Sequence, residues 1–173
     1  MVDGLGRQPQ ELRGRWNTSK YFGRGIDYPF FVPMIGGMET PFLTFERRKE
    51  ITRAWGDLLA RYPWEWFVTL TFVEDVHPEA AFKKWRWWIA KLSRSLYGPR
   101  WYKKGMVFWA VAFEHQKRGV LHFHALVNGV SKARRLTWMD KWYEMDPVTG
   151  FARIEVVKSI EATSHYICKY VAK

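Results

Sequence analysis

The sequence predicts an α+β fold in which helices pack against one antiparallel sheet. Three observations lead to this prediction. Four short segments are rich in β-branched and aromatic residues, which is typical of strands. Segments with apolar residues at helical spacing precede, separate and follow them. The chain has 173 residues, of which 47% are hydrophobic, and this is enough for one domain with its own core.

The first 41 residues differ from the rest of the chain. Residues 1–41 are rich in Gly, Pro and Arg and show no sustained period, so we expect an irregular basic and aromatic arm. Its aromatic side chains are expected to anchor it on the domain, although a basic arm lying along DNA is an alternative. The folded domain is predicted to occupy residues 42–173.

The domain is expected to begin with a helix and a strand. Apolar residues recur at helical spacing from Glu46 to Tyr62, with Thr44 as a plausible N-cap and Pro63 as a stop. Residues 66–72 follow, and they alternate Thr with apolar residues as a strand does.

The middle of the chain predicts a long helix and a hairpin. Pro78 is a favourable first residue for a helix that runs to about Tyr97 and ends at Gly98-Pro99. Two apolar runs, at 106–115 and 120–127, then flank a short turn, so they are expected to pair as strands.

A third helix is predicted from Lys132 to about Glu144, a fourth strand from Phe151 to Val157, and a last helix from Ile160 to Lys173. The complete order is α-β-α-β-β-α-β-α. This order is satisfied by the ferredoxin-like or RRM-like arrangement of one antiparallel sheet with flanking helices.

Charge and aromatic content favour a nucleic-acid partner. The chain has 28 Lys and Arg against 17 Asp and Glu, a formal charge of +11, and 18% of its residues are aromatic, including 11 Trp. Cations release counterions when they neutralise phosphates, and exposed rings stack on unpaired bases. The alternative is a heavily aromatic core with solvated charges outside it.

Several classes of protein are excluded or disfavoured. Cys168 is the only cysteine, so neither a disulfide framework nor a multi-cysteine zinc site is available. The N-terminus lacks the pattern of a secretory signal, and no apolar stretch is long enough for a membrane span. We therefore expect a cytoplasmic location and no membrane partner. The sequence also lacks a G-x-x-x-x-G-K-[ST] phosphate loop.

Two histidines indicate a metal site. His122 and His124 lie two residues apart in a predicted strand, so both imidazoles project from one face of the sheet. Imidazoles held together in this way are often metal ligands, although a pair of hydrogen-bonded histidines on the surface of an edge strand is the simpler alternative.

The hairpin predicts a third ligand. If Gly119 adopts the left-handed conformation at the end of a three-residue loop, Glu114 lies directly opposite His122. A loop of another length would place His115 there instead. Two imidazoles and one carboxylate leave coordination positions open, and a phosphodiester substrate would suit Mg²⁺ or Mn²⁺.

The last helix offers candidate nucleophiles. Tyr166, Lys169, Tyr170 and Lys173 fall on one stripe of it, and an apolar face can dock on the sheet. A phenol becomes an effective nucleophile towards phosphorus when nearby cations favour the phenolate and neutralise the phosphate. In isolation, the same pattern also fits an amphipathic surface helix with half-buried tyrosines and solvated lysines.

Together these motifs resemble the HUH endonuclease superfamily, which includes rolling-circle replication initiators, relaxases and some transposases. Phe67 to Phe72 resembles its first motif, and Glu114 to Gly119 with Leu121 to Val127 resembles its metal motif. Tyr166 to Lys173 resembles the doubled Tyr-x-x-Lys motif of the two-tyrosine replication proteins of small phages and plasmids. The tyrosines follow the histidines, which favours an initiator or transposase over a conjugative relaxase.

The resemblance implies a function for each motif. His122, His124 and Glu114 would bind Mn²⁺ or Mg²⁺, Tyr166 and Tyr170 would be nucleophiles, and Lys169 and Lys173 would position or neutralise the phosphate. The domain would nick single-stranded DNA at an origin nick site or hairpin through a 5′-phosphotyrosine and then rejoin it. A host helicase and polymerase are the expected further partners.

Two other functions stay open at this stage. One is a catalytically silent module that binds single-stranded nucleic acid through its aromatic rings and cations. The other is a metal phosphodiesterase that activates water and uses the tyrosines only structurally. The abrupt end at Lys173, on the last residue of the motif, suggests a longer natural protein.

Overall fold

The computed structural model describes residues 44–104, 107–115 and 119–170, so the predicted arm at 1–41 and Lys173 lie outside the described residues. The predicted order of elements is confirmed, with one additional short helix, α3. The elements are α1 (Phe45–Leu59), β1 (Trp66–Phe72), α2 (Pro78–Tyr97), α3 (Trp101–Lys104), β2 (Phe108–His115), β3 (Leu121–Asn128), α4 (Arg135–Tyr143), β4 (Thr149–Val156) and α5 (Ile160–Cys168).

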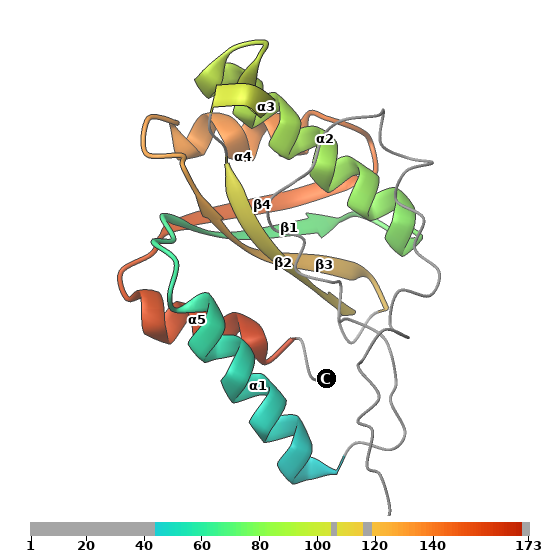
Figure 1. Ribbon diagram of the computed structural model, residues 1–173. Coiled ribbons are helices and arrows are strands. Elements are labelled where there is room, and N and C mark those ends of the chain that lie inside the picture. The colour runs from blue at the N-terminus through green and yellow to red at the C-terminus, as the bar shows by residue number, and fades with distance from the viewer. Residues whose placement is uncertain (1–43, 105–106, 116–118, 171–173) are drawn as a thin grey trace, which may run out of the picture.

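The four strands form one antiparallel sheet in the order β2-β3-β1-β4. This is the strand order of the ferredoxin-like arrangement, so the predicted α+β fold is confirmed. Helices α2, α3 and α4 lie on one side of the sheet, and α1 and α5 lie on the other (Figure 1). None of the described helices combines the length and hydrophobicity that a bilayer crossing needs.

The larger core lies between the sheet and helices α2 and α4. It is dominated by fully buried rings, and the indole of Trp88 donates a hydrogen bond to the Trp138 carbonyl at 3.1 Å. Many of the aromatic residues counted in the sequence are therefore structural. The largest of these buried rings are Trp85, Trp88, Trp142, Phe72 and Phe123.

A smaller core lies on the opposite face of the sheet. Leu126 and two alanines of β2 contact the buried side of α5 there, and Leu59 of α1 closes the cluster from outside. Because side chains alternate along a strand, the same strands supply both cores. The sequence of β3 shows this directly, since Phe123 belongs to the larger core and Leu126 to the smaller one.

Helix ends follow local hydrogen bonding. Thr44 caps α1 by accepting from the Arg47 backbone amide, as predicted. The helix ends at Leu59 and not at Tyr62, because the indole of Trp64 folds back and donates to the Leu59 carbonyl at 2.7 Å. The left-handed Gly98 (φ 79°) ends α2 where it was predicted to end.

Two other boundaries differ from the sequence prediction. Helix α4 begins at Arg135 and not at Lys132, because a turn with an Ala133 to Val130 hydrogen bond of 2.8 Å precedes it. Strand β4 begins at Thr149, two residues before the predicted start, since residues from Thr149 onward pair with β1. The last helix, predicted to reach Lys173, is helical to Cys168, and residues 171–173 are not described.

Helix α1 packs against α5 through a glycine. A Cβ at Gly56 would lie 2.1 Å from Nδ1 of His165, and Nε2 of the same ring lies 3.3 Å from an Asp57 carboxylate oxygen. We therefore expect Gly56→Ala to destabilise the domain by about 1–3 kcal/mol through overpacking, measured as a lower midpoint in urea unfolding.

A second variant separates overpacking from other effects of the alanine. In the double variant Gly56→Ala/His165→Ala, the added methyl group would occupy space that the ring has left, so part of the lost stability should return. The control is Arg53→Ala on the same helix, whose side chain is 84% exposed. Equal losses for Gly56→Ala and Arg53→Ala would contradict the packing argument.

Candidate active site

The β2–β3 hairpin brings the predicted acidic residue and the histidines together. Gly119 has a φ of +83°, the left-handed conformation that the sequence predicted. Glu114 pairs directly with His122, and His124 pairs with Ala112, so the predicted register is confirmed. His115, which the alternative register would have offered, pairs with Leu121.

Both histidines are buried in the middle of the sheet. His122 is 6% exposed and His124 is 8% exposed. Strand β3 lies between β2 and β1, so the alternative of surface histidines on an edge strand does not hold. Phe123, between them, points into the larger core and fixes the direction of both imidazoles.

His124 is oriented by contacts on both sides of its ring. Nε2 lies 3.3 Å from a Glu114 carboxylate oxygen, and Nδ1 lies 3.3 Å from the Thr69 hydroxyl. The Phe67 ring stacks nearly parallel to the imidazole at 6.0 Å. Partners of this kind hold a histidine in one orientation, as in sites where an imidazole binds a metal.

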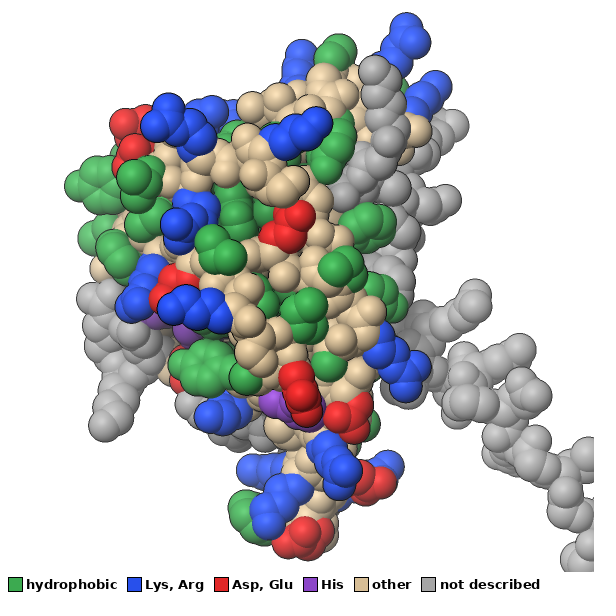
Figure 2. Space-filling view, turned by 90° about the vertical axis from the view of Figure 1, so that its left-hand side faces the viewer, with side chains coloured by type: hydrophobic (Ala, Val, Ile, Leu, Met, Phe, Trp, Pro, Cys, Tyr) green, Lys and Arg blue, Asp and Glu red, His purple; other side chains and the backbone are tan. Residues whose placement is uncertain are grey.

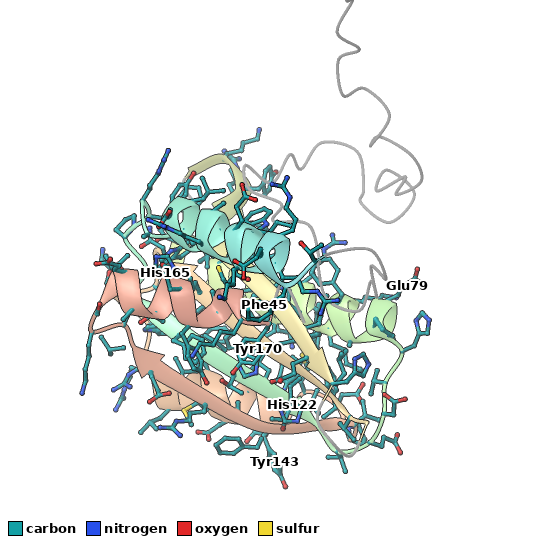
Figure 3. The ribbon with its side chains drawn as sticks, turned by 90° about the horizontal axis from the view of Figure 1, so that it is seen from below. Phe45, Glu79, His122, Tyr143, His165 and Tyr170 are labelled. Atoms are coloured by element: carbon teal, nitrogen blue, oxygen red, sulfur yellow. The ribbon has the colours of Figure 1, made fainter. Side chains whose placement is uncertain are left out.

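The terminal segment places both phenols beside these groups. The Tyr170 ring stacks on His124 with the ring centres 4.1 Å apart and the planes 10° from parallel. Its hydroxyl donates to the Tyr166 hydroxyl at 2.9 Å. Seen from below, Tyr170 lies where α5 meets the sheet, on the same face as His122 (Figure 3). Sequence motifs that lie far apart along the chain therefore form one cluster.

The two tyrosines have different surroundings. Tyr166 is 43% exposed, and its ring meets Phe67 edge-on. Burial raises the pKa of Tyr170, and the hydrogen bond to Tyr166 and the nearby Glu114 carboxylate raise this pKa further. Tyr166 is therefore the more accessible of the two phenols to a substrate strand.

Lysine and cysteine complete the description of α5. The Lys169 ammonium lies 5.0 Å from the centre of the Tyr166 ring, so one predicted cation is beside a predicted nucleophile. Lys173 is outside the described residues. Burial raises the pKa of the Cys168 thiol to about 12, so this side chain is protonated at neutral pH and does not compete as a nucleophile.

The donors suit a divalent ion in kind. Glu114, His122 and His124 present one carboxylate and two imidazoles on the same sheet face, a set with room for water or substrate oxygens. Among the residues that the structure describes, no group of three such side chains is already arranged around a common point. Glu114 and His124 are in contact, and His122 lies across the ladder from Glu114, so rotation of side chains would complete the set.

Sequence reasoning missed the contribution of β1 and β4. Thr69 pairs with His124 on one side and with Arg153 on the other, so all three side chains share the face of the site. Arg153 is exposed and forms an ion pair with Glu155 at 2.9 Å. The alternating Thr residues of β1 were visible in the sequence, but their neighbours depend on strand order, which no local pattern specifies.

An α+β domain with this cluster on one sheet face matches a known class of protein. The family of replication-associated proteins of the ORF2 type matches residues 65–173, which is more than half of the chain. The chain belongs to this family of replication-associated proteins. The match includes every predicted site residue and excludes α1.

Comparisons with individual proteins add little. The crystal structure of the hypothetical protein ORF119 from Sulfolobus islandicus rod-shaped virus 1 is similar to this chain, with 17% identity and a TM-score of 0.43. The similarity covers 68% of this chain and 91% of that chain. No curated protein matches the chain at a significant level.

Proposed function

We propose that the protein starts rolling-circle replication of a plasmid or phage by nicking and rejoining one strand of origin DNA, as HUH endonucleases of the two-tyrosine type do. The observation that supports this most is the stacking of Tyr170 on His124, with its hydroxyl bonded to Tyr166. A catalytically silent module would not need two phenols beside a buried pair of imidazoles and a carboxylate. Membership of a replication-associated family favours an initiator over the transposase alternative.

The proposed reaction is a pair of transesterifications. The oxygen of one tyrosine attacks the scissile phosphorus and forms a phosphotyrosine bond. The bond from phosphorus to the 3′ oxygen breaks, the phenol loses its proton, and the 3′ oxygen takes one up and leaves as a hydroxyl. A returning 3′-hydroxyl, or the second tyrosine, then attacks the phosphotyrosine, so the energy of the phosphodiester bond is conserved.

The chain's own side chains have distinct roles in this proposal. Tyr166 is the accessible phenol, and the hydrogen bond from Tyr170 stabilises negative charge on its oxygen. Lys169, together with Lys173, would neutralise the phosphate. Thr69 holds the orientation of His124.

A divalent ion, Mn²⁺ or Mg²⁺, is the proposed cofactor. Glu114, His122 and His124 would hold it, because they supply hard and borderline donors on the face that carries the phenols. When bound, such an ion polarises a phosphoryl oxygen and neutralises charge on it.

Covalent attachment tests the mechanism. Single-stranded oligonucleotides tiled across the replicon that encodes the chain are labelled at the 3′ end and incubated with the protein and Mn²⁺. The products are then run on a denaturing gel. We expect the label to migrate with the protein, since the 5′-phosphotyrosine holds the downstream fragment, while 5′-labelled strands yield a free fragment that a polymerase can extend.

The other outcomes of this experiment separate the alternatives. Cleaved DNA whose label never migrates with the protein would indicate water as the nucleophile, and the tyrosine mechanism would be wrong. DNA that is bound at the origin but never cleaved, with Mn²⁺ or Mg²⁺ present, would indicate the single-strand binding module. A parallel incubation with excess EDTA serves as the control for metal dependence.

A further inference from the structure

A second basic surface lies on the opposite side of the sheet from the tyrosines. Between Ala80 and Phe113 the chain has eight Lys or Arg and no Asp or Glu, although the whole chain has 17 acidic residues. This segment contains α2 and α3, which lie on the other side of the sheet from α5 (Figure 1). Much of the protein's positive charge is therefore concentrated away from the proposed active site.

The exposed side chains of α2 form a straight stripe. Lys83, Trp87, Lys91 and Arg94 are all exposed, and at 100° per residue they fall within about 80° of one another around the helix. Within the described residues, no carboxylate lies at salt-bridge distance from these three cations. By contrast, Lys84 on the neighbouring face forms an ion pair with Asp146.

An aromatic ring is part of this stripe. Trp87 is 48% exposed, whereas the other two tryptophans of α2 are buried in the core. The Lys91 ammonium lies 3.5 Å from the centre of the Trp87 ring. The surface continues onto α3, where Tyr102 is 41% exposed and Arg100 and Lys103 are also exposed. Large exposed rings beside cations favour a partner that has both flat apolar faces and negative charge.

We infer that the α2–α3 surface is a second binding site for single-stranded DNA, which holds unpaired strand outside the segment that is cut. Phosphates would lie along Lys83, Lys91 and Arg94, and an unpaired base would stack on Trp87. A duplex would satisfy the cations but would leave the ring unused, because its bases are already stacked. The site is separate from the tyrosine cluster and does not depend on its chemistry.

The surface at α1 provides a matched control. Arg47, Lys49 and Arg53 are as exposed as the stripe on α2, but each forms an ion pair with an acidic residue of the same helix. In Figure 2 the projecting lower end of the molecule, where α1 begins, shows this mixture of blue and red side chains. Replacing these three residues removes the same charge as replacing the three cations of α2.

The test measures binding of fluorescein-labelled oligothymidine, long enough to span both sides of the sheet, as a function of salt and in EDTA so that nothing is cut. In the variant K83A/K91A/R94A, the slope of log K against log salt should fall by about 2, since each single-strand phosphate contact contributes about 0.7. The variant R47A/K49A/R53A should leave the slope unchanged. Equal changes in the two variants, or none in the first, would overturn the inference.

Trp87→Ala tests the stacking contact separately. It should weaken binding of oligothymidine by about 5-fold or more and leave binding of a duplex of equal length unchanged. Because Trp87 lies at the surface, the variant is expected to fold, and its circular dichroism spectrum checks this. Unchanged affinity for oligothymidine in a folded Trp87→Ala protein would show that α2 is not a stacking site. These results stand whether or not the tyrosines form a covalent adduct.

Discussion

His122→Ala is expected to slow strand cleavage by at least about a thousandfold, because loss of a ligand removes several kcal/mol of charge stabilisation at the phosphate. Binding of single-stranded DNA should change little, since phosphate contacts by Lys and Arg supply most of the affinity. His122 lies opposite Glu114 in the hairpin and is 6% exposed, so its imidazole has a fixed place in the proposed site.

The experiment pairs cleavage with a direct measure of the metal. Titration calorimetry should show Mn²⁺ binding to the wild-type protein and much weaker binding to His122→Ala. The control is His115→Ala, which removes an exposed imidazole from the same hairpin and should leave both cleavage and Mn²⁺ binding intact. Full cleavage by the wild-type protein in excess EDTA would refute the proposed metal site.

Replacing both phenols is expected to have the second large effect. Tyr166→Phe/Tyr170→Phe should lose cleavage by at least about a thousandfold, because removal of a nucleophile leaves only binding and charge stabilisation. Of the single variants, Tyr166→Phe should slow the first cut more. Tyr166 is exposed and accepts the hydrogen bond, while the Tyr170 ring is stacked on His124.

The readout is the amount of covalent protein–DNA adduct and the rate of nicking for each variant. Tyr143→Phe is the matched control, since Tyr143 is 68% exposed and lies at the far edge of the sheet from Tyr170 (Figure 3). Its activity should equal that of the wild type. Cleavage at the normal rate by the double variant would show that the tyrosines are structural and that water attacks the phosphate.

The sequence predicted well those features that depend on neighbouring residues. The alternation of Thr and apolar residues identified β1 with its correct bounds, and Gly98-Pro99 identified the end of α2. The short helix α3 was missed because its four residues, Trp101–Lys104, are too few for a helical period to be visible. The earlier end of α1 was missed because it depends on a side chain, Trp64, beyond the helix.

The candidate site was predicted in part for the same reason. The hairpin brings Glu114 opposite His122 through a turn whose geometry Gly119 already indicates. Thr69 and Phe67 could not be assigned, because they reach His124 only through the pairing of β1 with β3, two strands that are distant in the sequence. Such long-range pairing depends on the packing of the whole sheet.

The sequence by itself determined which residues could share a face: two imidazoles and a carboxylate on one hairpin, and two phenols with a lysine on one helix. Turn geometry and the strand and helix periods are local, so they can be read from a few residues. Only the tertiary structure decided that the phenols meet the imidazoles, with Tyr170 stacked on His124 and α1 packed behind α5 through Gly56. That contact depends on how distant apolar surfaces fit together when they are buried, and no single segment encodes this fit.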